Sequence, residues 1–563
     1  MILQALKEYY DRKPDLPRLG LQEKEIPYIV SIKRDGTPIA LTPTHEGEGK
    51  KRRAKRFLVP QAVKKTSGVG SNLLWENPEY ALGVSIKGKT EVKHAAFLRR
   101  IENLGDLKDE GIDAVKQFLA LKDKQQRMAA FPDWNTVVQD GLNISFQLAG
   151  DDVLVCQRPK VIQTIMTTSC EDADPCAGIC LITGSREPLE RLHIAIKGVR
   201  GAQTSGANIV SFNLDAFNSY GKEQGFNAPV SKSAAFAYTT AINHLLDRDS
   251  RQKMQIGDAT TIFWAARDTS IEEQMADFFS EAPKDDPDRN VRAVESLFRS
   301  VESGAFATDK DTTRFYVLGL APNASRIAVR FWIASTVAEM AAHIRQHFID
   351  LRITHGQKEK DILSLFRLLL STAVQSKADN ISPNLAGDTM RAILQGLPYP
   401  QTLLQAAIRR IRAEHDITYP RAALIKACIN RSIRFSNPLI KEELAMSLNP
   451  ANINIGYRLG RLFATLEKIQ QEASPGINAT IRDKFYGAAS STPVTVFGNL
   501  MRLKNHHLAK LEHEGCRVFF EKLIGEIMDS ITDFPSHLPL ADQGRFAVGY
   551  YHQMQEFYTK KNQ

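Results

Sequence analysis

The pattern of hydrophobic residues changes near residue 359, and this change limits the possible folds more than any other feature of the sequence. Before it, short runs rich in β-branched and aromatic residues alternate with segments whose hydrophobic residues recur at helical spacing. After it only helical spacing is found, as in 362–374 and 403–411. The sequence therefore predicts an α+β N-terminal region followed by an all-α C-terminal helical bundle.

Individual elements can be placed in the N-terminal region. The turn-forming stretch 321–325 separates two strand-like runs, so a hairpin is expected there. Helices are expected at 234–246 and 335–352. Strands are expected at 26–32, 153–156, 209–214, 260–264, 314–320 and 326–333.

The last part of the chain, from Met446 onwards, is expected to be a helical bundle of its own. Its first helix has Arg458, Arg461 and Lys468 off its hydrophobic stripe. Thr492 is followed by a proline and predicts another helix start, because proline at the first turn needs no backbone donor. We expect an α+β region at 1–355, a helical connector at 356–445 and the bundle at 446–563, and leave open a further division near residue 150.

The charge of the chain is concentrated at its beginning. The first hundred residues hold 20 Lys and Arg against 11 Asp and Glu, a difference that equals the +9 of the whole chain. Clustered charge repels itself, and a polyanion is its simplest partner, because neutralised phosphates release condensed counterions. A solvated basic loop is the alternative. The predicted DNA-binding cations are Lys50, Lys51, Arg52, Arg53, Lys55, Arg56, Lys64 and Lys65.

A glycine-rich segment follows the basic run. Gly68 and Gly70 let a backbone approach a ligand closely, and Ser71 and Asn72 offer small polar groups at the loop tip. Residues 73–75 are expected to anchor the loop on a core. Such a tip suits the DNA minor groove, whose edges show mainly acceptors at A·T pairs, so 70–72 are predicted to bind DNA. A turn with a buried tryptophan is the alternative.

A second polar stretch lies between 200 and 225, with uncharged hydrogen-bonding residues in turn-forming sequence. A structural loop is the alternative to a nucleic-acid surface. The candidates for additional nucleic-acid contacts are Gln203, Thr204, Ser205 and Asn208.

Residues 83–90 match the Walker A pattern letter for letter and end in Lys89 and Thr90. A functional phosphate loop needs a buried strand before it and an acidic residue at the end of a second strand. Only 80–82 precede the pattern here, and the nearest second strand, 209–215, is interrupted by polar residues. Both requirements of a phosphate loop are thus poorly met, and a P-loop ATPase that acts on nucleic acid is kept as the alternative function. No cofactor is expected.

Cys170, Cys176 and Cys180, with His193 beyond them, are the candidates for a metal site. Their spacings of six and four residues are looser than the paired cysteines of zinc sites. Reduced cysteines are favoured and zinc is left open. The sequence holds no nucleophile elbow, metalloprotease helix or other compact catalytic motif, so neither a metal nor an enzyme activity is predicted.

The composition, 43% hydrophobic and 24% charged, is that of a soluble globular protein. Charged residues at positions 7, 8 and 11 argue against a secretory signal peptide. No stretch approaches the roughly 20 apolar residues of a membrane span. Six cysteines in 563 residues do not make a disulfide framework. We therefore expect a soluble, cytoplasmic protein.

Several stretches together resemble one family, the large subunit of the type I-C CRISPR surveillance complex, Cascade. The similarity runs from the first residues to near the end, and its motifs are long enough to be specific. It is carried by 70–83 (GSNLLWENPEYALG), 180–184 (CLITG), 196–220 (IKGVRGAQTSGANIVSFNLDAFNSY), 318–332 (LGLAPNASRIAVRFW), 457–470 (YRLGRLFATLEKIQ), 478–483 (NATIRD) and 506–511 (HHLAKL).

The resemblance implies a non-enzymatic, DNA-binding scaffold subunit of a ribonucleoprotein. Such a subunit recognises the protospacer-adjacent motif, helps to open the duplex, stabilises the R-loop and docks a separate helicase-nuclease, while guide RNA supplies the remaining specificity. It implies that 70–72 recognise the motif and that 50–65 bind phosphate. The implied partners are target duplex and displaced strand, guide RNA, repeated backbone subunits, a guide-end-binding subunit and a small subunit.

The resemblance also implies that the small subunit is made by translation starting inside this reading frame. Met446 stands at the edge of the expected bundle, whereas Met390 would leave connector helices attached and Met501 and Met528 would cut into it. The bundle is expected to need nothing upstream to close its core. A chance methionine at a domain edge is the alternative. A free-standing DNA-binding protein that needs no guide is a third hypothesis for the whole chain.

Overall fold

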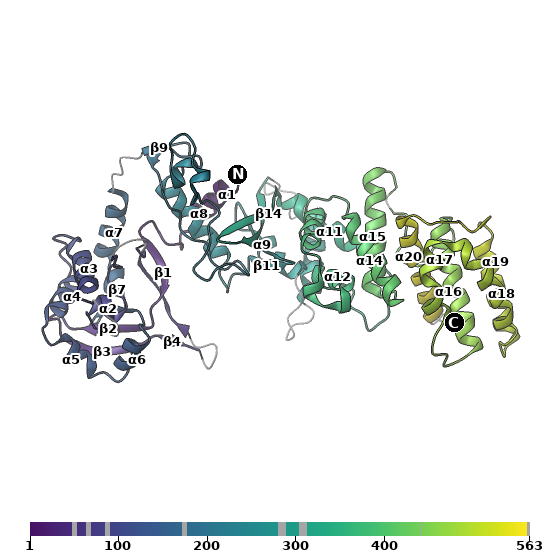
Figure 1. Cartoon of the computed structure of the whole chain (residues 1–563), viewed down its shortest axis with the longest axis horizontal. Helices are drawn as coiled ribbons and strands as arrows, with labels where there is room; N and C mark the ends of the chain where they lie inside the picture. Colours follow the sequence, from purple (N-terminus) through teal and green to yellow (C-terminus); the bar gives the residue numbers. More distant parts are fainter. Residues whose placement is uncertain are drawn as a thin grey trace. The chain divides into compact units, whose positions relative to one another are not determined.

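The computed structural model describes residues 1–47, 53–63, 69–84, 90–171, 177–279, 289–302, 312–440 and 442–559. The chain divides into two compact units. Figure 1 labels the helices and strands along the chain. The N-terminal unit comprises 10–194 and 210–241, and the C-terminal unit comprises 1–9, 195–209 and 242–563. The boundaries expected near 355 and 445 both fall inside the C-terminal unit and stay predictions about its subdivision.

The N-terminal unit is built on a four-stranded sheet with the order β3-β2-β8-β7. Its two central strands are parallel and the outer pairs are antiparallel. Two antiparallel ribbons, β1 with β6 and β4 with β5, complete the strands around it. The bounds are β1 (Leu21–Glu25), β2 (Tyr28–Ile32), β3 (Pro38–Pro43), β4 (His45–Glu46), β5 (Arg53–Ala54), β6 (Arg56–Pro60), β7 (Trp75–Glu76) and β8 (Ile144–Leu148).

Helices of the N-terminal unit cover this sheet and share its core. Phe97 and Phe118, from two different helices, both pack against Phe146 of β8, with ring centres 6.3 and 6.1 Å away. A short hairpin, β9 (Ala177–Ile179) with β10 (Arg186–Pro188), follows them. The helices are α2 (Pro78–Ala81), α3 (Thr90–Glu102), α4 (Glu110–Ala120), α5 (Lys124–Ala129), α6 (Trp134–Gln139) and α7 (Pro159–Glu171).

The C-terminal unit contains an antiparallel sheet with the order β11-β12-β13-β14. The expected hairpin is confirmed, since β13 and β14 are joined at Ala324, which has a φ of 52°. Trp264 of β12 donates through Nε1 to the carbonyl of Ala5 at 3.3 Å, which ties α1 to the sheet. Two helices cross the division between the units along the chain, α1 (Ile2–Arg12) at its end and α8 (Lys232–Leu245) near its end. The other elements of this part of the C-terminal unit are β11 (Lys253–Ile256), β12 (Ala259–Ala265), α9 (Ser270–Phe279), α10 (Arg289–Glu302), β13 (Arg314–Asn323) and β14 (Arg326–Thr336).

Two expected strands are wrong. The segment 153–156 turns into a 3₁₀ helix, because the side chain of Gln157 accepts the backbone N–H of Leu154 at 3.0 Å. The segment 209–214 is irregular and leaves Leu214 55% exposed, so it buries no continuous apolar face that would fix a strand register. The 3₁₀ helices are η2 (Val155–Gln157), η3 (Asp215–Phe217), η4 (Gln224–Asn227), η5 (Val374–Ser376), η6 (Ala378–Asn380) and η7 (Pro493–Thr495).

From residue 337 onwards the described chain is helical, as the change of pattern predicts. An α+β region is therefore followed by helices. They are α11 (Val337–Leu351), α12 (Leu365–Thr372), α13 (Pro383–Leu394), α14 (Gln401–Glu414), α15 (Tyr419–Ser436), α16 (Ile455–Ala473), α17 (Ile481–Ser491), α18 (Phe497–Leu508), α19 (Glu514–Met528) and α20 (Leu540–Tyr558).

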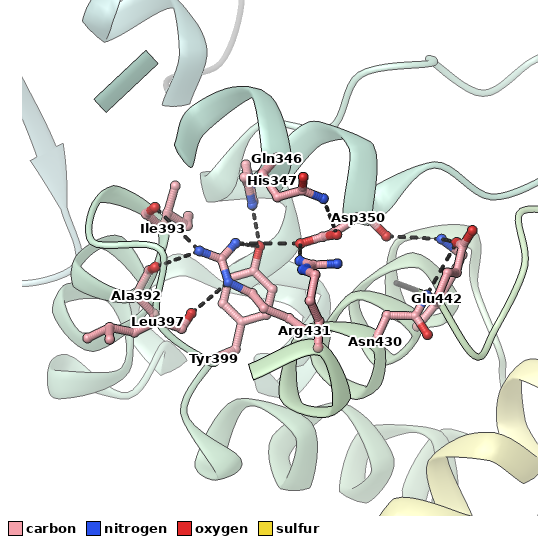
Figure 2. A network of polar contacts seen from close by, with 12 residues as sticks. Gln346, His347, Asp350, Ala392, Ile393, Leu397, Tyr399, Asn430, Arg431 and Glu442 are labelled. Atoms are coloured by element: carbon pink, nitrogen blue, oxygen red, sulfur yellow. Dashed lines mark hydrogen bonds and ion pairs between the residues drawn. The ribbon is translucent and has the colours of Figure 1, made fainter. Parts of the chain in front are cut away.

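A buried polar network joins three helical segments of the C-terminal unit (Figure 2). Asp350 of α11 and Arg431 of α15 are each 3% exposed, and their charged groups lie 3.6 Å apart. Arg431 also donates to the carbonyls of Leu397 at 2.6 Å and Ala392 at 2.8 Å. The network therefore joins α11 and α15 to the end of α13. Removing one member of the buried ion pair would leave the other charge uncompensated, so all members are needed to keep this packing.

Helix α16 is central to the C-terminal helices and contacts α17, α18, α19 and α20. Arg458 and Arg461, expected off the hydrophobic stripe, are nevertheless 6% and 2% exposed. Arg458 donates to the carbonyl of Ile527 at 3.0 Å, and Arg461 donates to Gln553 at 3.1 Å. The stripe predicts only one buried face, whereas neighbours on several sides bury this helix almost all round.

The C-terminal helices also pack on the helices that precede Met446. A Cβ added to Gly544 of α20 would lie 3.0 Å from side-chain atoms of Ile425 and Ile429 in α15. Arg545 binds Glu443 with both carboxylate oxygens, at 2.5 and 2.8 Å. In the full chain the bundle therefore does not close its core with downstream residues alone.

Candidate nucleic-acid interface

The described part of the basic run lies on the two ribbons of the N-terminal unit. Arg53 begins β5 and Arg56 begins β6, and both side chains are exposed. Each has an acidic residue as its partner in the strand register, Glu46 for Arg53 and Glu25 for Arg56. The other cations named from the sequence lie outside the described residues: Lys50, Lys51, Arg52, Lys64 and Lys65.

Lys55 lies between β5 and β6 and its side chain is exposed. Its backbone N–H donates to the carbonyl of Thr44 at 3.2 Å, and its carbonyl accepts from the N–H of Ile26 at 3.1 Å. Its ammonium lies 5.7 Å from the ring centre of Phe57. The backbone is thus held on both sides while the charge stays at the surface, an arrangement suited to phosphate contacts.

The segment after the glycines is anchored as expected. Residues 73–75 are buried in the core, with Trp75 3% exposed. Trp75 donates through Nε1 to the carbonyl of Pro60 at 2.9 Å, and the ammonium of Lys24 lies 5.8 Å from its ring centre. One tryptophan therefore links the glycine-rich segment to both strands of the β1–β6 ribbon.

The side chains of Ser71 and Asn72 do not form an exposed tip, since they are 4% and 5% exposed. Asn72 accepts the backbone N–H of Val63 at 3.0 Å and donates through Nδ2 to Glu76 at 3.0 Å. Both ends of its amide are thus used inside the protein. Gly70 is half-buried, and the neighbouring Val69 is 45% exposed.

Leu74 stores backbone strain next to this network. Its φ is 61°, a left-handed value that costs a residue with a side chain about 1–3 kcal/mol. The strain is held in place because Leu74 is fully buried and its carbonyl accepts the hydroxyl of Ser145 at 2.9 Å. Strained residues of this kind cluster at functional sites, which makes 69–76 a candidate functional segment.

The first part of the second polar stretch, up to residue 209, forms a loop in the C-terminal unit, and the rest of it belongs to the N-terminal unit. Ile196 and Ala207 exchange two backbone hydrogen bonds, of 2.8 and 2.9 Å, and close it. Asn208 is half-buried at its base, where its carbonyl accepts the N–H of Ile327 at 3.0 Å. The loop exposes three of the predicted residues and two cations that the sequence reasoning missed: Gln203, Thr204, Ser205, Lys197 and Arg200. The sequence signal that could have revealed these two cations is their position in or next to the same polar stretch.

A family model described as CRISPR-associated protein (Cas_Csd1) matches residues 6–558, nearly the whole chain. The chain belongs to the Csd1 family. Membership makes it a CRISPR-associated subunit of Cascade type and agrees with the resemblance carried by the sequence motifs. No curated protein sequence matches the chain significantly.

The described residues before the Walker A match of this Csd1 protein lack the strand that a phosphate loop needs. The residues before it form helix α2, whose N-terminus is capped by Asn77 through the N–H groups of Glu79 and Tyr80 at 3.1 and 3.3 Å. A phosphate loop requires a strand at that place. Thr90 is the first residue of α3, whereas Lys89 lies outside the described residues.

The cysteines form no metal cluster within the described part of the Csd1 chain, where no group of three or more potential ligands is found. Cys180 is buried and its sulfur accepts the N–H groups of Ile182 and Ser231 at 3.4 and 3.3 Å. His193 forms a hydrogen bond with the hydroxyl of Tyr238. The side chains of Cys170 and Cys176 lie outside the described residues.

A search of the described helices found none that is both long and apolar enough to cross a membrane.

Proposed function

We propose that this Csd1 protein is the DNA-contacting large subunit of a type I-C surveillance complex. In this role it recognises the protospacer-adjacent motif, helps to open the target duplex, stabilises the R-loop and docks a separate helicase-nuclease. Guide RNA, held by repeated backbone subunits and a guide-end-binding subunit, supplies the remaining sequence specificity by base pairing. The chain itself acts as a scaffold and not as an enzyme.

The observation that carries the proposal is a group of three exposed cations, Arg53, Lys55 and Arg56, on the β4–β5 and β1–β6 ribbons. We call this group the basic ribbon, and it lies beside the anchored segment 69–76. Arg53, Lys55 and Arg56 are exposed on backbone that is fixed by strand pairing. Because Arg53 and Arg56 each face an acidic residue across the strands, Lys55 and the neighbouring lysines in the sequence supply the excess charge. Such a ribbon is suited to bind phosphates, while a nearby structured segment recognises base edges.

The buried amide of Asn72 gives it a positioning role in this proposal. Asn72 accepts from the N–H of Val63 and donates to Glu76, and so holds these two residues in fixed positions around it. In this proposal Gly70 and the neighbouring Val69 recognise the motif, while Lys64 and Lys65 bind phosphate together with the rest of the basic run. Direct recognition by Ser71 or Asn72 would require the segment to open.

For the small subunit, we propose an internal product that starts at Met446. Met446 is 55% exposed, and its carbonyl accepts the N–H of Thr354 at 2.9 Å in the full chain. A product starting there lacks α14, α15 and Glu443, and so exposes the face of α20 around Gly544. It therefore needs a neighbour in the complex to cover that face.

Binding of the assembled complex to target duplex at several salt concentrations tests the basic ribbon. Arg53→Ala combined with Lys55→Ala should weaken binding to every duplex and flatten the log–log salt slope by about 0.9 per lost phosphate contact. Arg34→Ala with Arg299→Ala removes two exposed arginines elsewhere, 77% and 79% exposed, and should leave the slope unchanged. An unchanged slope in the ribbon variant would show that the ribbon does not contact phosphate.

A further inference from the structure

A tight hairpin in the N-terminal unit presents an isolated aromatic ring. Ser219 and Lys222 pair across a two-residue turn, and the N–H of Lys222 donates to the carbonyl of Ser219 at 3.0 Å. The central residues, Tyr220 and Gly221, have φ values of 51° and 68°, as a type I′ turn requires. Tyr220 is 98% exposed, so its ring contributes almost no burial to the fold.

The side chain of Asn227 fixes this turn in place. Its Oδ1 accepts the N–H of Ser219 at 3.0 Å, and its Nδ2 donates to the carbonyls of Lys222 at 3.1 Å and Gln224 at 3.0 Å. One amide therefore pins both arms of the hairpin. A turn held in this way keeps the backbone of Tyr220 in one conformation, which lowers the ordering cost when a ligand binds the ring.

Tyrosine is energetically unfavourable at this turn position. Asparagine, aspartate and glycine are preferred where a type I′ turn needs a positive φ, whereas other side chains are strained there. A fully exposed ring gains no burial that would offset this strain. Stability of the turn therefore does not explain the tyrosine, and a contact with another molecule does.

The residues next to Tyr220 in the sequence indicate what that molecule is. Residues 218–223 contribute hydroxyl, amide and charged groups beside Tyr220 and no second apolar side chain. A protein-docking anchor is usually embedded in a desolvated apolar patch. Single-stranded nucleic acid is bound instead by an aromatic ring that stacks on a base, with a nearby cation on the backbone, and Lys222 is such a cation.

We propose that Tyr220 is a stacking platform for one unpaired base of single-stranded nucleic acid, with Lys222 placed toward the adjacent phosphate. The inference rests on the proposed function, because an opened target supplies unpaired bases. It adds a residue and a mode of binding that the basic ribbon does not provide. Glu223 follows Lys222, so stacking and not net charge supplies most of the affinity.

The test uses the guide-loaded complex with full-length chain and a single-stranded thymidine oligonucleotide. Tyr220→Phe keeps the ring and should bind within about twofold of the parent, whereas Tyr220→Asn should weaken binding roughly 5- to 100-fold. Asparagine suits the turn, so the melting temperature of Tyr220→Asn should equal or exceed that of the parent. As a second readout, 5-iodouracil placed in the displaced strand should photo-cross-link to the peptide that contains Tyr220.

Parent affinity and cross-linking in Tyr220→Asn would overturn the inference. Unchanged DNA binding with weaker recruitment of the helicase-nuclease would also overturn it and would make the ring a protein-docking residue. Motif-dependent binding of duplex by the parent complex is measured in parallel. If that binding is present, a failure at Tyr220 leaves the proposed function standing; if it is absent, the proposed function itself fails.

Discussion

At the scale of single residues, burial decides what Asn72 does. Asn72→Ala leaves the N–H of the half-buried Val63 and the buried carboxylate of Glu76 without this partner. We expect it to lower the free energy of unfolding by about 1–3 kcal/mol, measured by urea denaturation of the purified chain. Asn505→Ala, at an exposed position on α18, is the matched control and should change it by less than about 0.5 kcal/mol. Parent stability combined with weaker binding of motif-bearing targets alone would instead make Asn72 a direct contact to the bases.

The same residue shows what the sequence could and could not predict. The anchoring role of 73–75 was predictable, because three consecutive large apolar residues next to glycines need a core. The burial of Asn72 was not predictable from its neighbours, since its partners stand at residue 63 and Glu76 on either side of a loop. A polar residue in a glycine-rich segment has the same local sequence pattern whether its amide faces solvent or is bonded to two distant residues inside the protein.

At the scale of elements, two glycines let α16 and α20 approach closely. A Cβ on Gly460 would lie 2.0 Å from the carbonyl oxygen of Phe546, and one on Gly549 would lie 2.1 Å from that of Tyr457. Gly460→Ala should therefore destabilise the C-terminal unit by at least about 1–3 kcal/mol, because backbone has to move. Gly487→Ala in α17 meets nothing within 4 Å and should stabilise by up to about 1 kcal/mol. Equal melting temperatures for the two variants would contradict this packing.

Helix α11 carries a pH-sensitive residue in the network of Figure 2. Burial, and then the positive charge of Arg431, lowers the pKa of His347 to about 3. In the unfolded chain its pKa is near 6.5, so between these values the unfolded state binds a proton that the folded state does not. Stability should therefore fall as the pH decreases from about 6.5, by about 2 kcal/mol at pH 5.

His347→Gln should remove this part of the pH dependence while lowering stability at neutral pH, because Gln cannot match the hydrogen bond to Tyr399. His552 of α20 behaves in the same direction, since burial and then Lys426 lower its pKa to about 3, and it should keep part of the slope in that variant. Urea denaturation of the parent and the variant between about pH 5 and 7.5 measures how steeply the free energy of unfolding changes with pH in each. The same slope in the variant and the parent would show that folding does not lower the pKa of His347.

Element types followed from the sequence wherever apolar residues formed a long strand-like run or recurred at helical spacing. The hairpin of β13 and β14 and the helices after residue 337 are of this kind. The burial of the α16 arginines was not predicted, because a hydrophobic stripe identifies only apolar side chains, which need no hydrogen-bonding partner when they are buried. Arg458 and Arg461 are buried through carbonyl and amide acceptors supplied by distant segments, which no local spacing encodes.

At the scale of the whole molecule, the N-terminal unit carries the basic ribbon and the Tyr220 turn, and the C-terminal unit carries the polar loop closed by Ile196 and Ala207. The chain leaves and re-enters each unit, so a linear division of the sequence could not have found them. Several separate candidate surfaces on one chain are consistent with the Csd1 match, because a Cascade-type subunit has both nucleic acid and other subunits as partners.

The central claim is that this chain gives the guide-loaded complex its recognition of the adjacent motif. The most direct measurement selects bound duplexes from a library in which every member carries the guide-complementary target and random bases flank it. Complexes reconstituted with the chain should enrich one short flanking motif, and complexes without it should bind weakly and enrich none. The same enrichment in both, or no enrichment in either, would contradict the account.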